Sequence, residues 1–185
     1  MLQRHCGFER AFDHLCRSEM LFIPEDFRLM DFSVRWSSRV LAVYQSDLSY
    51  LEEQGVLVSS LGLISADKQY RYFDLLASTV VMSCMESGYD ILDAIDIGLI
   101  VADELECLAE KIPGIEISVN NLEEIVFEVL SDENLVRTSA VPNIEPQLIS
   151  TKVAIDTVNM SSRCMELKSK RHSEPLSLSA VDFAN

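Results

Sequence analysis

The chain has 185 residues, of which 48% are hydrophobic and 24% are charged, and its formal net charge is −15 at pH 7. A chain of this length and composition can bury a sizeable core in one domain, which excludes general disorder and removes any need for disulfides or structural metals. The acidic balance disfavours direct binding to nucleic acid or anionic lipid, because both attract clustered lysine and arginine.

The N-terminal third of the chain shows helical patterns separated by breakers. An apolar stripe over residues 8–19 predicts a first helix that ends near Phe22. Pro24 then fits the first turn of a further helical segment, where its missing N–H is tolerated. Apolar residues at helical spacing predict a second helix over 33–54, which stops at Gly55.

The middle of the chain carries two further predicted helices. The apolar run 56–64 is short, and it is compatible with either a buried connection or a strand. Ser65 is a suitable N-cap for a helix that ends at Gly88. Asp90 can cap the next helix, which ends before Pro113.

The C-terminal third mixes strand and helix signals. Alternation over 115–119 predicts a short strand, and Asn120 with Glu123 three residues later predicts the start of a helix through a capping box. Residues 135–141 are a candidate for a second strand. The last predicted helix ends near Met165.

These elements predict a mainly α fold, a single-domain helical bundle of about five to six helices with room for one short β-hairpin. The helical domain is predicted to span 1–166. Residues 167–185 are predicted to form a flexible C-terminal tail, acting either as a movable cover on the acidic region or as a handle for a partner. The tail holds the chain's only basic cluster: Lys168, Lys170, Arg171 and His172.

The stretch 90–110 places seven carboxylates among apolar residues and contains no basic residue. It lies within an acidic segment, 86–135, whose net charge is −13. At about 100° per residue, one broad face of this helix is apolar and rich in small residues, which predicts a central position with close approach of another helix. That face comprises Ala94, Gly98, Val101, Ala102, Leu105, Leu108 and Ala109. The acidic residues group on the other face: Asp93, Asp96, Asp103, Glu106 and Glu110.

Four apolar side chains fall among these acids instead of on the core face: Leu92, Leu99, Ile100 and Cys107. One interpretation is an ordinary solvated face with a few covered apolar residues. Another is a docking surface with apolar anchors inside an acidic rim. A metal or catalytic site is the weakest interpretation, because the sequence lacks Glu-x-x-His pairs and a calcium-loop pattern. The candidate partner-binding residues are Leu92, Asp96, Leu99, Ile100, Asp103, Cys107 and Glu110.

No complete catalytic, nucleotide-binding or zinc-protease motif occurs in the sequence, so we expect neither enzymatic activity nor a cofactor or metal. Ser65-x-x-Lys68 matches one motif of penicillin-recognising enzymes, but the companion motifs are missing, and helix capping explains the serine. The only soft-ligand cluster has a spacing unlike that of any zinc finger. It comprises His5, Cys6, His14 and Cys16.

The cysteine pattern indicates a reducing compartment. The five cysteines are odd in number and widely spaced, and they form no Cys-x-x-Cys motif. The sequence shows neither the apolar core of a signal peptide nor an uncharged stretch long enough for a membrane span. We therefore expect a cytoplasmic protein without membrane insertion.

Two functional hypotheses follow. The first is a non-enzymatic adaptor or chaperone that holds a basic or amphipathic segment of another protein through apolar anchors in its acidic face. In size and charge the chain is similar to small acidic chaperones and coupling adaptors of bacterial secretion systems, although no residue motif carries that similarity. The alternative is an inhibitor, such as an immunity or phage anti-defence protein, that plugs a basic nucleic-acid-binding or catalytic groove.

Overall fold

The computed structural model describes residues 20–60, 69–132 and 145–173, with side chains in the last range through Lys170. Within these ranges the protein is mainly α, which confirms the predicted fold class. The elements in chain order are β1 (Met20–Phe22), η1 (Phe27–Leu29), β2 (Asp31–Ser33), α2 (Val34–Leu41), α3 (Gln45–Glu53), β3 (Gln69–Arg71), α4 (Tyr72–Glu86), α5 (Ile91–Lys111), β4 (Glu116–Ser118), α6 (Val119–Leu130) and α7 (Pro146–Ser173). The short element η1 is a 3-10 helix.

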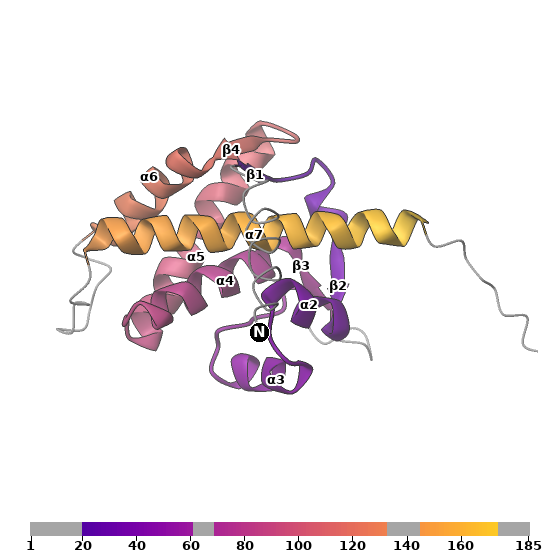
Figure 1. Ribbon diagram of the computed structural model, residues 1–185, viewed down its shortest axis with the longest axis horizontal. Helices are drawn as coiled ribbons and strands as arrows, with labels where there is room; N and C mark the ends of the chain where they lie inside the picture. The colour runs from indigo at the N-terminus through magenta and orange to yellow at the C-terminus, as the bar shows by residue number, and fades with distance from the viewer. Residues whose placement is uncertain (1–19, 61–68, 133–144, 174–185) are drawn as a thin grey trace, which may run out of the picture.

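The long helices α4, α5 and α7, together with α6, enclose the core. α4 packs against both α5 and α7, and α6 packs against α7. In Figure 1, α7 crosses the width of the molecule, with α6 on one side of it and α3 near the opposite edge. Leu75, Ile97, Leu122 and Val153 come from the four packed helices and are fully buried in one apolar cluster. The fold is therefore built around α7 and the α4–α5 pair.

α4 and α5 approach each other most closely at Gly98. A Cβ atom at this position would lie 2.5 Å from Val81 Cγ2 and 3.0 Å from the carbonyl oxygen of Ala77. Ala94 and Ala102, about one turn away on either side, are also buried. The small residues of α5 therefore admit a neighbouring helix, as the sequence predicts.

Two antiparallel strand pairs join segments that are far apart in the sequence. β1 pairs with β4, which places Leu21 opposite Ile117, and β2 pairs with β3, which places Phe32 opposite Tyr70. All four side chains are buried, so each pair covers part of the core. The predicted strand before α6 is confirmed as β4, but neither pair is a hairpin. The candidate strand over 135–141 lies outside the described residues.

Two predicted helices in the N-terminal third differ from the structure. The first was predicted to end near Phe22, but this residue closes strand β1; the rest of that predicted helix lies outside the described residues. Pro24 begins a turn that leads into η1, and its carbonyl accepts the Phe27 N–H at 3.1 Å. The helix predicted over 33–54 is interrupted at Ala42, which has a left-handed φ of 58° and ends α2. Apolar spacing continues across this break and therefore conceals it.

α4 begins later than predicted. Its first residue is Tyr72, directly after strand β3, so Ser65, which lies outside the described residues, is not its N-cap. The carboxylate of Asp74 accepts the backbone N–H of Arg71 at 2.7 Å and closes the first turn of the helix. The predicted end is confirmed, because Gly88 follows the helix with a φ of 98°.

The caps of α5 and α6 test two further predictions. Asp90 caps α5 as predicted, with its Oδ1 accepting the N–H of Leu92 at 2.9 Å. The predicted cap of α6 is wrong by two residues. Ser118, rather than Asn120, caps this helix, and its Oγ accepts the N–H of Asn121 at 3.2 Å. The serine also belongs to β4, so strand and helix join without a loop.

The last helix is longer than predicted. α7 continues through Ser173 instead of ending near Met165. In its final part Leu167 is buried, and Lys168 Nζ lies 2.5 Å from an oxygen of Asp26. Helix α7 therefore continues past residue 166 and contacts the rest of the fold there. Residues 174–185 of the predicted tail lie outside the described residues.

Candidate functional site

α5 carries all seven predicted partner-binding residues and exposes them unequally. Leu92 is 66% exposed and Leu99 is 49% exposed, which is high for large apolar side chains. The remaining exposed members are Asp103, Cys107 and Glu110, whereas Asp96 and Ile100 are half-buried. Ile100 also packs against the core. Within the predicted surface, the two leucines are therefore exposed to solvent, whereas Asp96 and Ile100 are partly covered.

The opposite face of α5 is buried as predicted, apart from the half-buried Leu108. Asp93 departs from the prediction: it was grouped with the solvated acids, yet it is only 1% exposed. Tyr89, which is buried in the segment that precedes α5, lies close enough to Asp93 to feel its charge. Burial first, and then the charges of Cys84 and Asp93, raise the pKa of Tyr89. A helical wheel describes one helix only, so it could not predict the burial of Asp93 by other parts of the fold.

A cavity of about 270 Å³ opens between α4, α5 and residues 55–60. α4 contributes Phe73 and Val81 to its lining, and α5 contributes Ile95 and Leu99. Val58, which is 60% exposed, lies on the third wall. The floor of this cavity is therefore apolar and open to solvent.

The cavity brings together only part of the predicted surface. Leu99 and Asp103 line it, together with Ile95 and Glu106, which were not among the predicted residues. Ile95 and Glu106 lie within about 40° of Leu99 on a helical wheel, so position on the helix could have identified them. The other predicted residues are not among its lining: Leu92, Asp96, Ile100, Cys107 and Glu110.

A second cavity, of about 150 Å³, adjoins the first and shares part of its lining. The shared residues are Ser60, Phe73, Asp74 and Glu106. Arg28 and Arg71 line only the second cavity, so basic side chains occur at this end. We call the two cavities together the α4–α5 groove. Its lining changes from mainly apolar at one end to charged at the other.

Hydrogen bonds hold the third wall of the groove against α4. Asp74 accepts both the N–H and the Oγ–H of Ser60, each at 3.2 Å, in addition to the N–H of Arg71. Ser78 Oγ donates to the carbonyl oxygen of Val56 at 2.9 Å. These bonds engage the Asp74 carboxylate with backbone and serine donors. They hold residues 55–60 against α4 without any ligand.

The remaining acids of the groove have no such partners. Neither Asp103 nor Glu106 forms a side-chain hydrogen bond or ion pair with the described part of the chain. Burial raises the pKa of Glu106, and the charges of Glu110 and Asp103 raise it further, while Arg28 and Arg71 oppose them. Arg28 itself pairs with Glu110. Within the described residues, these two carboxylates therefore form no ion pair.

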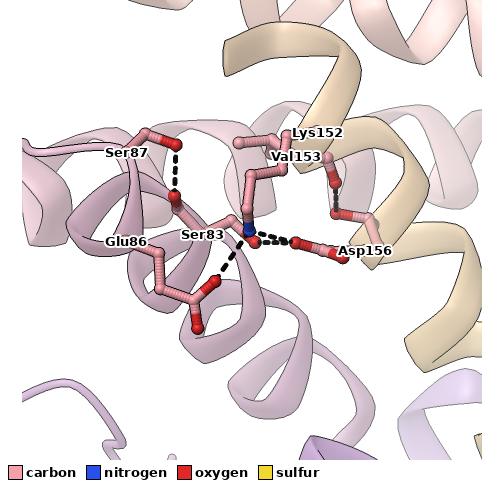
Figure 2. A network of polar contacts seen from close by, with 7 residues as sticks. Ser83, Glu86, Ser87, Lys152, Val153 and Asp156 are labelled. Carbon is pink, nitrogen blue, oxygen red and sulfur yellow. Dashed lines mark hydrogen bonds and ion pairs between the residues drawn. The ribbon is translucent and has the colours of Figure 1, made fainter. Parts of the chain in front are cut away.

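A polar network links α4 to α7 on another part of the molecule. Figure 2 shows the Lys152 ammonium between Glu86 and Asp156, with Nζ at 2.9 Å and 2.7 Å from their oxygens. The buried Ser83 donates from Oγ to the same Asp156 oxygen at 2.6 Å. The network thus combines a serine, a lysine and two carboxylates, the residue types of several hydrolytic sites.

The protonation of Lys152 decides what this network can do. Burial alone would lower the pKa of Lys152, but its hydrogen bonds to Asp156 and Glu86 outweigh burial and raise that pKa. A lysine must be neutral to remove a proton from a serine hydroxyl, so Lys152 is unsuited to activate Ser83. The network instead fastens α4 to α7.

The described cysteines and acids offer little other reactive chemistry. Burial raises the pKa of the Cys84 thiol to about 12 and raises the pKa of Cys164 as well, so neither forms a thiolate near neutral pH. Cys107 is exposed on α5. No group of three or more metal-binding side chains occurs among the described residues. The Ser65–Lys68 motif and the soft-ligand cluster near the N-terminus lie outside those residues.

No helix in the described ranges is both long enough and apolar enough to cross a membrane. The chain shows no significant match to a family model, to a curated protein or to a solved structure.

Proposed function

We propose that this protein is a non-enzymatic adaptor or chaperone that holds a segment of another protein in the α4–α5 groove. The groove is the observation that supports the proposal. It combines a concave apolar floor with a few polar groups, which is the usual composition of a binding site. Exposed apolar groups inside a polar rim also mark surfaces that interact with other proteins.

Leu99 is the anchor on which the proposal depends most. It lines the larger cavity and leaves about half of its side chain in solvent. Covering that half would contribute roughly 1 kcal/mol, because full burial of a leucine contributes about 1.5–3 kcal/mol. A carboxylate at the same place would lose this contribution and would also need desolvation when a partner binds. A substitution of Leu99 should therefore weaken partner binding while the protein stays folded.

Charge and composition support a more specific form of the proposal. The acidic segment 86–135 would attract a basic or amphipathic segment of another protein and would repel nucleic acid. Small size, a net charge of −15 and cysteines without a disulfide pattern favour a cytoplasmic adaptor or chaperone of the kind that bacterial secretion systems use. The partner would be a polypeptide, held without chemical change.

Site-specific photo-crosslinking tests the proposal. A photoreactive amino acid would replace Leu99 in one variant and Leu148 in a control. Leu148 is 61% exposed on α7 and does not line the groove. In cells that express the chain natively, we expect one dominant crosslinked protein from position 99 and no corresponding product from position 148. Mass spectrometry would identify the crosslinked protein.

Affinity measurements with that purified protein complete the test. We expect Leu99→Asp to weaken binding about tenfold or more, since each 1.4 kcal/mol changes the affinity tenfold, while Leu148→Asp changes it less than about twofold. Circular dichroism would show that both variants remain folded. Unchanged binding by the Leu99 variant would refute the proposal. A crosslinked enzyme of nucleic-acid metabolism that loses activity in the complex would instead support the inhibitor hypothesis.

A further inference from the structure

The charges on the rim of the α4–α5 groove restrict what can bind there. Asp103 and Glu106 both line the larger cavity, and Glu106 also lines the smaller one. They are three residues apart on α5, so they lie on the same side of the helix. Their two carboxylates therefore stand next to each other above an apolar floor.

Arg28 and Arg71 are the described cations whose charges act on Glu106, and neither forms an ion pair with Asp103 or Glu106. Arg28 forms an ion pair with Glu110, one turn beyond Glu106. Arg71 lines only the smaller cavity and forms no ion pair with Glu106. Its charge and that of Arg28 reduce the repulsion on Glu106 without removing it, because burial and the neighbouring acids still dominate. A cation supplied by a ligand would stabilise both carboxylates through charge-assisted hydrogen bonds.

The size of the groove limits the rest of the ligand. An engineered apolar cavity of about 150 Å³ accommodates a benzene molecule. The larger cavity, at about 270 Å³, therefore has room for about two side chains of leucine or phenyl size. A ligand that fills the floor and reaches the rim would carry two apolar groups and one cation. A short polypeptide segment has this composition.

We infer that the groove receives a partner segment with two apolar side chains on the floor and one lysine or arginine against Asp103 and Glu106. This inference rests on the proposed function and specifies the chemistry of the partner. A second copy of the chain is a poor occupant, because two molecules of charge −15 repel each other. Among its described lining residues, the larger cavity has three carboxylates and no lysine or arginine, and this imbalance favours a basic segment.

A library of random twelve-residue peptides, displayed on phage, is the probe for this inference. The library would be selected on the full-length protein and, in parallel, on the Leu99→Asp variant. Peptides that bind both proteins would be discarded, because they bind outside the groove. We expect the Leu99-dependent peptides to share two apolar residues and a nearby lysine or arginine. Fluorescence polarisation with the synthetic peptides would then give dissociation constants.

A pair of matched double variants isolates the charges. Asp103→Asn with Glu106→Gln removes the two groove carboxylates, and Glu104→Gln with Glu128→Gln removes two exposed carboxylates that do not line the groove. We expect the first pair to weaken peptide binding about ten- to hundredfold, the range for lost hydrogen bonds to charged groups, and the second less than about twofold. Replacing both groove acids by lysine should favour peptides with glutamate in place of the basic residue.

The outcomes distinguish this inference from the proposed function. Leu99-dependent peptides without a basic residue, or with equal affinity for the variant that lacks both groove carboxylates, would overturn the inference and leave the proposed function intact. If no selected peptide depended on Leu99, both would fail. Light scattering provides a further check, because a concentration-dependent dimer abolished by Leu99→Asp would make a second copy the occupant and overturn the inference.

Discussion

Glu106 is the residue at which burial and charge act most directly on the groove. It lines both cavities, and its carboxylate lies near those of Asp103 and Glu110. A side chain in this position destabilises the empty protein when it is ionised, and it can regain that free energy when a cation binds. The same residue therefore links folding stability to ligand preference.

Glu106→Gln should show this link in the pH dependence of stability. The folded state raises the pKa of Glu106 above its ordinary value of 4.5, so the folded protein binds this proton more tightly than the unfolded chain does. The resulting stability is fully present below pH 4.5 and is lost as the pH rises through the folded pKa. We therefore expect the variant to gain stability relative to the wild type as the pH rises from 4 to 7.

Urea unfolding of both proteins at several pH values would measure this difference. Asp103→Asn should change the profile in the same direction, because its charge also raises the pKa of Glu106. A stability difference between Glu106→Gln and the wild type that does not vary with pH would contradict the prediction.

At the scale of secondary structure, the helices are held by two different means. α4 and α5 approach through small residues, with little space between them at Gly98. α7 also packs on the apolar core, and polar contacts attach it along its length: Asp156 accepts from Ser83, Ser161 donates to the carbonyl of Phe22, and Arg163 Nε donates to the carbonyl of Val40. Substitutions in the two contacts should therefore differ in their effects.

Gly98→Ala should destabilise the protein even though alanine is the better helix former. Alanine gains about 1 kcal/mol in helix propensity over glycine. The new methyl group would lie within 2.5 Å of Val81 Cγ2 and 3.0 Å of a backbone oxygen. Overpacking of a tight core costs about 1–3 kcal/mol. We expect a net loss of up to about 2 kcal/mol in the free energy of unfolding, measured with urea.

A double-mutant cycle with Val81→Ala would test the cause. Shortening Val81 removes the nearer contact, so the added methyl group at position 98 should cost less in that background than in the wild type. If Gly98→Ala cost the same free energy of unfolding in both backgrounds, its contact with Val81 would not be the cause of the strain.

Truncations test the end of α7. Removal of residues 167–185 eliminates the buried Leu167 and the ion pair between Lys168 and Asp26, whereas removal of 174–185 leaves both in place. We expect the longer deletion to cost roughly 2 kcal/mol more than the shorter one, mostly from the leucine, since an exposed ion pair contributes at most about 1 kcal/mol. Denaturation of both truncated proteins would give the difference. Equal stabilities would support the predicted domain boundary at 166.

At the scale of the whole molecule, local signals in the sequence predict the helices better than their connections. Gly55, Gly88 and Asp90 mark helix ends through backbone conformation or capping, and each prediction is confirmed. The break at Ala42 carries no such signal, because alanine rarely adopts a left-handed conformation. Strands β1, β2 and β3 likewise carry no clear local signal, since each depends on a partner far away in the sequence, whereas alternation predicts β4.

The same distinction applies to the groove. Leu99 and Asp103 could be predicted because an exposed leucine among acids violates the amphipathic pattern of α5. Phe73 and Val58 could not, because they join the groove only when α4 and residues 55–60 pack against that helix. Sequence periodicity describes one helix at a time, whereas a groove is made by several elements.

The attachment of β1 to α7 has a consequence for the newly made chain. The carbonyl of Phe22 accepts a hydrogen bond from Ser161, which lies 139 residues later. At a synthesis rate of about 5–20 residues per second, Phe22 waits roughly 7 to 28 s for this partner. During that interval strand β1, whose Leu21 is fully buried in the finished molecule, lacks the part of its cover that α7 provides. A protein proposed to shelter another polypeptide therefore emerges from the ribosome with a similar need for shelter.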